Sequence, residues 1–272
     1  MQISTALGLP VGEAKLEAQI LLQHCRNVNR AWLLTHENDA LEANIFAQFE
    51  MLLKRRLGGE PIAYILRKRE FYGLEFKVTK DTLIPRPDTE TLVDSALEKI
   101  PGDSYCRVLD LGTGTGAIAI AIARHRPLAQ VTAVDASAAA LAVAQENVQS
   151  LRASNVQCVL SNWFDALSGQ TFDVIVSNPP YIAEADSHLD QGDLRFEPDS
   201  ALVAGADGLE CIRQIINQAP PHLEPQGWLM LEHGYDQAER VAELMKTAGF
   251  GAISSAADLS GVLRVTLGRH PP

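Results

Sequence analysis

The stretch VLDLGTGTG at residues 108–116 decides the fold expected for this chain of 272 residues. Its first four residues, largely apolar, predict a short buried strand. Glycine then stands at 112, 114 and 116, where a tight turn can bring the backbone close to a ligand. The apolar segment at 117–123 predicts a helix directly after this turn. The free N–H groups at the start of that helix would therefore face a bound anion.

The same alternation of strand and helix continues to the end of the chain. Strands are expected at 131–134, 156–160, 172–176 and 228–231, helices at 138–151 and 236–248, and a closing antiparallel pair at 252–254 and 263–267. This order predicts an α/β fold with a mostly parallel sheet covered by helices on both faces. Ligands of such sheets bind beyond the carboxyl ends of the strands, where the strand order reverses.

The first part of the chain has a different organisation. Apolar residues at near-helical spacing predict a small bundle of helices within 12–66, and alternation around a glycine at 70–78 predicts a β-hairpin. The segment 84–88, IPRPD, cannot be helical, because each proline fixes its own φ and restricts the residue before it. Asp88 or Thr89 is expected to cap the helix that follows.

These patterns divide the chain into three expected parts. They are a helical domain at 1–69, a hairpin linker at 70–88, and the sheet domain at 89–272.

Composition excludes several classes of protein. The formal net charge of −11 disfavours binding to bare nucleic acid. No apolar run reaches the roughly 18 residues of a membrane span, and the N-terminus does not resemble a secretory signal. Four scattered cysteines without a C-x-x-C pair are typical of reduced thiols in a cytoplasmic protein. The histidines show no metal-ligand spacing, so no metal is expected.

Acidic and aromatic residues accompany the glycine turn. Asp110 precedes it and Asp135 follows the second strand, about 20 residues on, where a carboxylate can accept hydrogen bonds from ribose hydroxyls. The acid at 110 suits a ligand with an ammonium group as well as a carboxylate, and S-adenosylmethionine has both. Asn162 and Trp163, after the third strand, are candidates for contact with adenine. The alternatives without a ligand are that the glycines form only a tight structural turn and that Trp163 belongs only to the core.

A second motif, Asn178-Pro179-Pro180-Tyr181, ends the fourth strand. Two prolines stiffen the turn, so the Asn178 side-chain oxygen and the Pro179 carbonyl can both point outward as acceptors. Two such acceptors can orient a planar NH2 group, whose delocalised lone pair makes it a poor nucleophile. Tyr181 can stack on the planar substrate group or lie against a sulfonium. This chemistry works by positioning and needs no acid or base of matched pKa.

Together, the glycine turn and the N-P-P-Y tetrad resemble class I S-adenosylmethionine-dependent methyltransferases, which have a Rossmann-like sheet. Residues 83–90, LIPRPDTE, 195–198, RFEP, and 231–235, LEHGY, resemble more narrowly the release factor glutamine methyltransferase family. The resemblance implies methylation of the glutamine amide in the Gly-Gly-Gln motif of peptide chain release factors. It also implies that the N-terminal domain helps to hold this protein substrate.

The resemblance and the residue chemistry together give the expected site. The cofactor would be bound by Asp110, Gly112, Thr113, Gly114, Thr115, Gly116, Asp135, Asn162, Trp163 and Asn178. Asn178, Pro179, Pro180 and Tyr181 would bind the substrate, with Asn178, Pro179 and Tyr181 as the catalytic set. The acidic loop 184–207 is expected to serve as a lid or substrate groove. We expect a monomer that contacts neither nucleic acid nor membrane.

Four alternatives stay open at this point. A ribosomal-protein glutamine methyltransferase shares the chemistry, although residues 85–90 favour release factors. An adenine-specific DNA methyltransferase uses the same N-P-P-Y tetrad, but it also needs a basic cleft to bind DNA. An NAD(P)-dependent oxidoreductase needs a G-x-G-x-x-G turn, and position 117 is alanine. A binding module without catalysis would leave the tetrad without a use.

Overall fold

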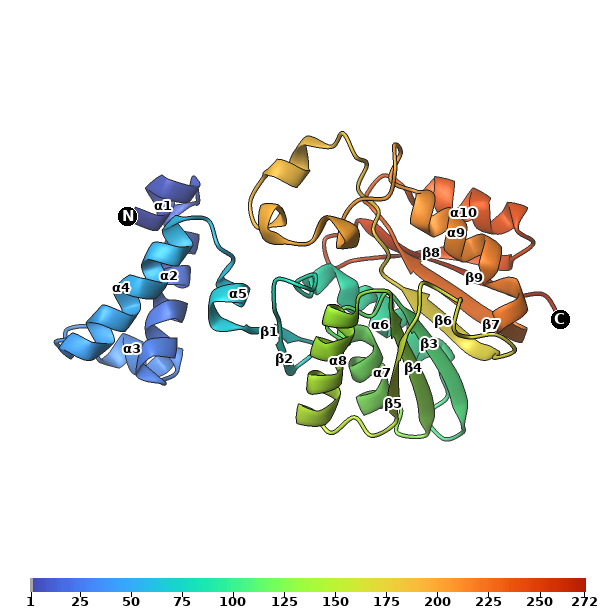
Figure 1. The fold of residues 1–272 in the computed structure, drawn as a ribbon, viewed down its shortest axis with the longest axis horizontal. Helices are drawn as coiled ribbons and strands as arrows, with labels where there is room; N and C mark the ends of the chain where they lie inside the picture. The colour runs from blue at the N-terminus through green and yellow to red at the C-terminus, as the bar shows by residue number, and fades with distance from the viewer. Residues whose placement is uncertain (1) are drawn as a thin grey trace. The chain divides into compact units, whose positions relative to one another are not determined.

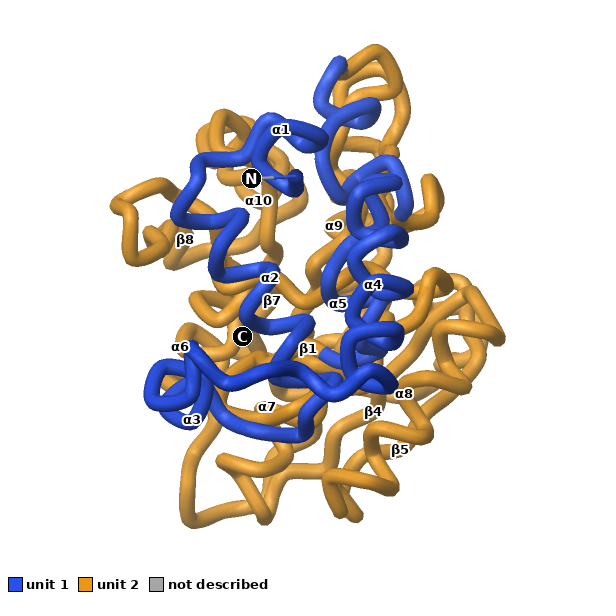
Figure 2. Tube along the Cα trace, turned by 90° about the vertical axis from the view of Figure 1, so that its left-hand side faces the viewer, with its two compact units in different colours: residues 1–68, 187–196 blue, residues 69–186, 197–272 orange. Residues whose placement is uncertain are grey.

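The computed structural model describes residues 2–272 and divides the chain into two compact units. The first contains the chain up to residue 68 together with 187–196, and the second contains 69–186 together with 197–272 (Figure 2). The segment 187–196 lies far along the chain from the other residues of its unit. Sequence position alone does not reveal that grouping.

The first unit is helical, as the apolar spacing predicts. Its elements are α1 (Gln2–Leu7), α2 (Val11–Arg26), α3 (Arg30–Thr35), α4 (Ala43–Leu57), α5 (Ile62–Leu66) and the short 3-10 turns η2 (Ser187–Asp190) and η3 (Leu194–Phe196). Leu21, Leu52 and Ile65 form its small buried core. Arg56 is buried beside that core, where its guanidinium pairs with Glu17 at 2.8 Å and with Asp193 at 3.3 Å. The buried arginine thereby ties the segment 187–196 to the helices.

The second unit is built on a sheet of seven strands in the order β5-β4-β3-β6-β7-β9-β8 (Figure 1). The strands are β3 (Cys106–Leu111), β4 (Ala129–Asp135), β5 (Val156–Leu160), β6 (Phe172–Ser177), β7 (Leu223–Glu232), β8 (Gly251–Ala257) and β9 (Leu263–Arg269). Strands β3 to β7 pair in parallel, and β9 runs antiparallel to both β7 and β8. The predicted α/β fold with a mostly parallel sheet and a closing antiparallel pair is confirmed.

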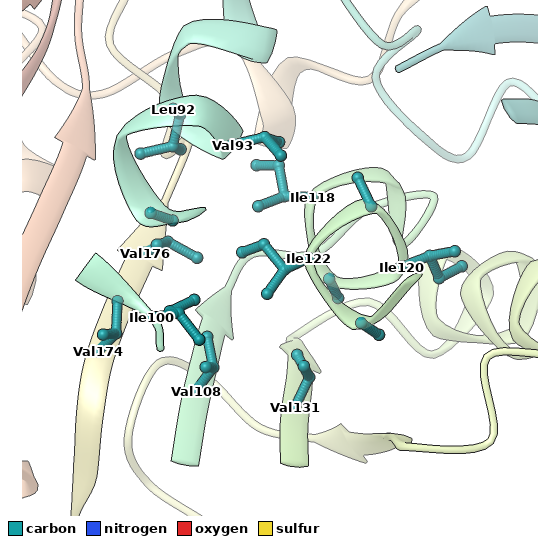
Figure 3. Packing of buried hydrophobic residues seen from close by; sticks show 14 of the residues in the cluster. Leu92, Val93, Ile100, Val108, Ile118, Ile120, Ile122, Val131, Val174 and Val176 are labelled. Atoms are coloured by element: carbon teal, nitrogen blue, oxygen red, sulfur yellow. The ribbon is translucent and has the colours of Figure 1, made fainter. Parts of the chain in front are cut away.

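Helices cover both faces of this sheet. They are α6 (Glu90–Lys99), α7 (Ala117–His125), α8 (Ala138–Ser150), α9 (Glu210–Gln218) and α10 (Ala238–Thr247). Alternate strand residues enter different cores: Val108 and Val174 pack with α6 and α7, as Figure 3 shows, whereas Leu109 and Ile175 pack with α9 and α10. This two-sided burial explains why the middles of the central strands, residues 108–109 and 174–176, are continuously apolar rather than alternating.

The predicted hairpin is present as β1 (Lys68–Phe71) and β2 (Leu74–Lys77). Tyr72 and Gly73, with φ of +52° and +73°, form the two-residue turn that such hairpins favour. Phe71 and Phe76 enter the sheet core. The Lys77 N–H donates to Oδ1 of Asn147 at 2.8 Å, which fixes the hairpin to α8.

Candidate functional site

The glycine turn lies at the carboxyl end of β3, between β4 on one side and β6 on the other. Gly112, Gly114 and Gly116 have φ of +70°, +55° and +80°. L side chains rarely adopt these angles, which explains the glycine at every second position. The Thr113 N–H donates to the Val134 carbonyl at 2.8 Å and so fixes the turn to the neighbouring strand. The turn therefore stands at the switch point of the sheet.

Asp110 lies beneath this turn and is completely buried. Its Oδ2 accepts hydrogen bonds from the Thr113 hydroxyl at 2.6 Å and from the Ala119 N–H at 3.2 Å, so the carboxylate ties the turn to α7. Its Oδ1 has no hydrogen-bond partner among residues 2–272. Burial raises the pKa of this carboxyl to about 7, although the two hydrogen bonds oppose the shift.

Asp135, the last residue of β4, connects the turn to the next helix. Its Oδ2 accepts from the Gly114 N–H at 2.9 Å and its Oδ1 from the Ser137 N–H at 2.8 Å. Burial raises the pKa of this carboxyl, while the backbone hydrogen bonds act in the opposite direction. The carboxylate thereby fixes the glycine turn and the loop before α8 in one geometry.

A cavity of about 310 Å³ opens at this edge of the sheet, wholly within the second unit. The predicted site residues that line it are Gly112, Thr113, Gly114, Thr115, Asp135, Asn162, Trp163, Asn178 and Pro180. Asp110, Gly116, Pro179 and Tyr181 belong to the predicted site but are not among its lining residues. The sheet thus brings most of the predicted residues to one hollow, and the other four lie beside or beneath it.

Trp163 forms one wall of the cavity. Its backbone has φ of +47°, and its indole Nε1 donates to the Gln214 side chain at 3.1 Å. A Cβ at Gly112 would lie 3.5 Å from the indole ring, so ring and turn are in close proximity. Asn162, exposed at the rim, donates to Asp165 at 3.3 Å.

The N-P-P-Y tetrad begins directly after β6. Ser177, which ends the strand, donates its hydroxyl to the Leu111 carbonyl at 2.7 Å and ties the tetrad to the glycine turn. Nδ2 of Asn178 donates to Oγ1 of Thr89 at 3.1 Å, which leaves Oδ1 as the acceptor of this amide. The Tyr181 hydroxyl donates to Oε1 of Glu232 at 3.4 Å, and burial raises the pKa of the tyrosine.

Thr89 occupies the N-cap position of helix α6, as expected, but its side chain does not cap the helix by a hydrogen bond. The chain enters the helix through the 3-10 turn η1 (Pro87–Thr89), and Thr89 makes no capping hydrogen bond. Its hydroxyl oxygen accepts a hydrogen bond from Nδ2 of Asn178 instead, so this oxygen serves the tetrad rather than the end of helix α6.

Several residues near the site were not singled out by sequence reasoning. Arg86 lines the cavity and forms an ion pair with Glu197, whose side chain is fully buried and also accepts from the Ile84 N–H at 2.8 Å. Cys211 of α9 lines the cavity as well. The segments 83–90 and 195–198, which contain Arg86 and Glu197, resemble the family and so carry a signal in the sequence, whereas Cys211 lies outside the quoted segments.

His233, which follows the last residue of β7, is buried and forms hydrogen bonds with the Thr266 hydroxyl and the Gly234 carbonyl, both at 2.9 Å. Within residues 2–272, no cluster of three or more His, Cys, Asp or Glu side chains is arranged to hold a metal ion. The described part of the chain also lacks a helix long and apolar enough to span a membrane.

A switch-point glycine turn, an acid on the next strand and an N-P-P-Y tetrad define a class I S-adenosylmethionine-dependent methyltransferase. Residues 89–194 match the Methyltransferase small domain, and residues 3–66 match the PrmC N-terminal domain. Over 257 residues the chain is 50% identical to the release factor glutamine methyltransferase of Xylella fastidiosa, covering 94% of each chain. The chain belongs to the release factor glutamine methyltransferase family.

One further relative agrees with this membership, and one solved structure shares the fold. The release factor glutamine methyltransferase of Pseudomonas aeruginosa is 50% identical over 256 residues, covering 94% of this chain and 92% of that one. Among solved structures, a methyltransferase from Pyrococcus furiosus has a TM-score of 0.57 at 18% identity, covering 81% of this chain and 98% of that one. The last likeness shows the fold alone.

The cavity combines apolar walls with a few polar groups. A Cβ added at Gly114 meets no heavy atom within 4 Å, so the turn leaves open space above its backbone. Apolar walls come from Phe71, Leu83 and Ile118, and polar groups come from the glycine turn and Asp135. A mostly apolar hollow with a few convergent polar groups is typical of a small-molecule site.

Proposed function

We propose that this protein methylates the side-chain amide nitrogen of the glutamine in the Gly-Gly-Gln motif of peptide chain release factors. The observation that carries the proposal is the arrangement of Asn178. Its Nδ2 is engaged by Thr89 at 3.1 Å, so its Oδ1 remains as an acceptor beside the cavity that the glycine turn lines. An acceptor there matches the NH2 group of a primary amide.

S-adenosylmethionine, when bound, supplies an electrophilic methyl group on its sulfonium. In the proposed site the backbone of Gly112 to Gly116 and the Asp135 carboxylate hold its amino-acid and ribose parts, and Trp163 and Asn162 contact adenine. Of these residues, Asp135 and Gly114 are already joined by a hydrogen bond of 2.9 Å. A preorganised site of this kind avoids ordering the loops when the cofactor binds.

The substrate glutamine is held by the tetrad. Oδ1 of Asn178 and the carbonyl of Pro179 accept the two hydrogens of its NH2 group, while Pro180 and Tyr181 contact the amide plane. Orientation of this kind can supply about 7–11 kcal/mol of the barrier in favourable cases. The nitrogen would form a bond to the methyl carbon as the carbon–sulfur bond breaks, which leaves a neutral thioether. The nitrogen would then release one proton to water, so no side chain of matched pKa is needed for that step.

We also propose that the helical unit docks the release factor. Its exposed apolar side chains include Val11, Leu34, Phe46 and Met51, which are 48–68% exposed. A protein substrate needs more contact area than one glutamine provides, and such side chains supply it at interfaces.

The chain would act as a monomer in the cytoplasm, because one chain carries both cavity and tetrad and release factors act there. Light scattering after size exclusion tests the monomer.

The proposed function is tested by incubating the enzyme with a labelled methyl donor and a purified release factor. We expect mass spectrometry of the Gly-Gly-Gln peptide to find one added methyl group on the glutamine. A release factor with alanine in place of that glutamine serves as the matched control. Label that enters a ribosomal protein or duplex DNA, and not the release factor, would refute the proposal.

A further inference from the structure

Trp163 has a strained backbone at the wall of the cavity. Its φ of +47° lies in the left-handed region, which bulky residues rarely adopt because their Cβ then crowds the backbone. Such strain persists only where the surrounding structure imposes it, and it is concentrated at active sites and ligand clamps. The contacts that hold this residue are therefore candidates for a functional role.

The hydroxyl of Ser161 holds the backbone of Trp163. This hydroxyl donates to the Trp163 carbonyl at 2.9 Å, and its oxygen accepts from the Ala166 N–H at 3.0 Å. Ser161 is itself joined to the sheet, because its N–H donates to the Asp135 carbonyl at 3.0 Å. The loop after β5 thus fixes the direction in which the Trp163 side chain leaves the backbone.

A second contact holds the far end of the same side chain. The indole Nε1 donates to Oε1 of Gln214, a residue of α9 that is 51 positions away in the sequence and is not among the cavity-lining residues, at 3.1 Å. An indole has one N–H donor and no acceptor, so this bond uses its whole hydrogen-bonding capacity. The ring therefore presents only apolar surface to the cavity.

The ring is thereby held between α9 and the glycine turn. A Cβ added at Gly112 would lie 3.5 Å from the ring, which is an ordinary van der Waals distance. Cys211, one turn before Gln214 on α9, lines the same cavity, so this helix borders the cavity beside the ring. A planar base that enters the cavity then meets a flat apolar surface that is already in place.

Without an acceptor at position 214, the indole N–H would be a partly buried donor that lacks its partner. The ring could then turn to another rotamer that lets the N–H reach water or a ligand, so the wall would lose its single orientation. Binding of a ligand would have to order the ring again, and this entropic cost is avoided when Gln214 holds it beforehand.

We propose that Gln214 is a positioning residue for the cofactor, which holds the Trp163 indole in one orientation as a preformed wall for the adenine of S-adenosylmethionine. The inference rests on the proposed function, because that function places adenine beside Trp163. It goes beyond it in two respects. A residue outside the cavity lining sets the affinity for the cofactor, and the indole packs against the base without donating a hydrogen bond to it.

The test measures the Kd of S-adenosylmethionine by calorimetry with the full chain, and thermal unfolding verifies that each variant folds. Gln214→Met keeps the length of the side chain but lacks a strong acceptor, whereas Gln214→Glu keeps an acceptor oxygen. Kd should rise by about three- to tenfold in Gln214→Met, the cost of ordering one side chain on binding, and Gln214→Glu should recover most of the loss. Gln218→Met, one turn further along the same helix, is the matched control and should match the wild type.

Two further readouts separate positioning from a merely structural role. Trp163→Phe keeps an aromatic ring but removes the N–H, so in that background Gln214→Met should change Kd by less than about twofold. In 1H–15N spectra of the enzyme alone, the indole resonance of Trp163 is assigned by its absence in Trp163→Phe. This resonance should shift and exchange faster with solvent in Gln214→Met, and it should stay in place in the Gln218→Met control.

Cofactor binding and methyl transfer test the two proposals separately. Wild-type affinity in Gln214→Met, an equal loss of affinity in the Trp163→Phe background, or an unmoved indole resonance would overturn the positioning role. The expected changes in Kd, found in an enzyme that leaves the release factor unmethylated, would support the role of Gln214 and refute the proposed substrate.

Discussion

Replacing Gly114 with alanine tests whether the glycine turn is shaped for a ligand or only for folding. Gly114 lines the cavity, has φ of +55°, and a Cβ built there meets no heavy atom within 4 Å. Gly116 offers a matched control: its φ is +80°, but it does not line the cavity, and its Cβ would lie 3.2 Å from Cδ1 of Ile120. The two substitutions thus share the backbone strain and differ in what the methyl group meets.

The expected magnitudes follow from these contacts. Alanine in the left-handed region costs about 1–2 kcal/mol, and it regains about 0.4–1 kcal/mol by restricting the unfolded chain. For Gly114→Ala the net loss is about 1 kcal/mol, which lowers Tm by about 2–4 °C in a chain of this size. Gly116→Ala adds overpacking against Ile120, so its loss should reach about 2–3 kcal/mol.

Affinity for S-adenosylmethionine should follow the opposite order. The alanine methyl group at 114 occupies space that the proposed ligand needs, so Kd should rise at least about tenfold, or about 1.4 kcal/mol. Gly116→Ala should change Kd by less than about threefold, because its methyl group meets protein rather than cavity. Isothermal titration calorimetry and thermal unfolding measure the two effects. Unchanged affinity in Gly114→Ala, or equal weakening in both variants, would refute the assignment of the turn to the cofactor.

Four further outcomes are expected. Asn178→Ala should lower turnover by about 100-fold or more while Kd for S-adenosylmethionine changes far less. If steady-state kinetics give a turnover near that of the wild type, Asn178 does not position the substrate amide. Asp135→Ala should weaken cofactor binding by about 1–3 kcal/mol in calorimetry, and an unchanged Kd would place the ribose elsewhere. Glu197→Ala removes the ion-pair partner of Arg86 and should lower the free energy of unfolding, measured with denaturant, by about 2–3 kcal/mol. Glu224→Ala, which breaks a more exposed ion pair, is the control and should lower it by about 0–1 kcal/mol. Burial raises the pKa of Glu232 from 4.5 to about 7, so the folded state binds this proton more tightly than the unfolded state does. The resulting contribution to stability is fully present below pH 4.5 and is lost as the pH rises through 7. Glu232→Gln should therefore raise Tm at about pH 8, and the gain should shrink towards about pH 4, whereas equal gains at both pH values would contradict the sign.

The sheet and the glycine turn could be predicted because their signals are local. Apolar runs of four to six residues separated by helical segments specify a parallel sheet. The glycines at 112, 114 and 116 specify a turn that only glycine adopts without strain. The proline-rich segment 84–88 likewise excluded an α-helix from its own composition, although its last two residues, Pro87 and Asp88, enter the 3-10 turn η1. In each case the deciding physics lies within a few consecutive residues.

The partners of Asn178 could not be predicted, because they depend on the register of the sheet. Thr89 lies 89 residues before Asn178, and its hydroxyl suits a helix cap as well as an amide partner. The amphipathic pattern of helix α6 gives no sign of which use prevails. Glu232 follows a fully apolar strand end, where a carboxylate is equally consistent with exposure to solvent. The pairing of β6 with β7 places Glu232 beside Asn178, whereas Thr89 reaches Asn178 from the turn before α6.

The strand ends also explain why positioning can suffice for this chemistry. The Thr113 N–H bonds to the Val134 carbonyl at 2.8 Å, and the Ser177 hydroxyl bonds to the Leu111 carbonyl at 2.7 Å. These two bonds join the ends of β3, β4 and β6, so the glycine turn and the tetrad are held on one rigid edge. Sites built on strand ends keep their geometry better than sites on free loops. In the proposed reaction a substrate amide then has only to be oriented against this fixed edge, where Nδ2 of Asn178 is already held by the Thr89 hydroxyl at 3.1 Å.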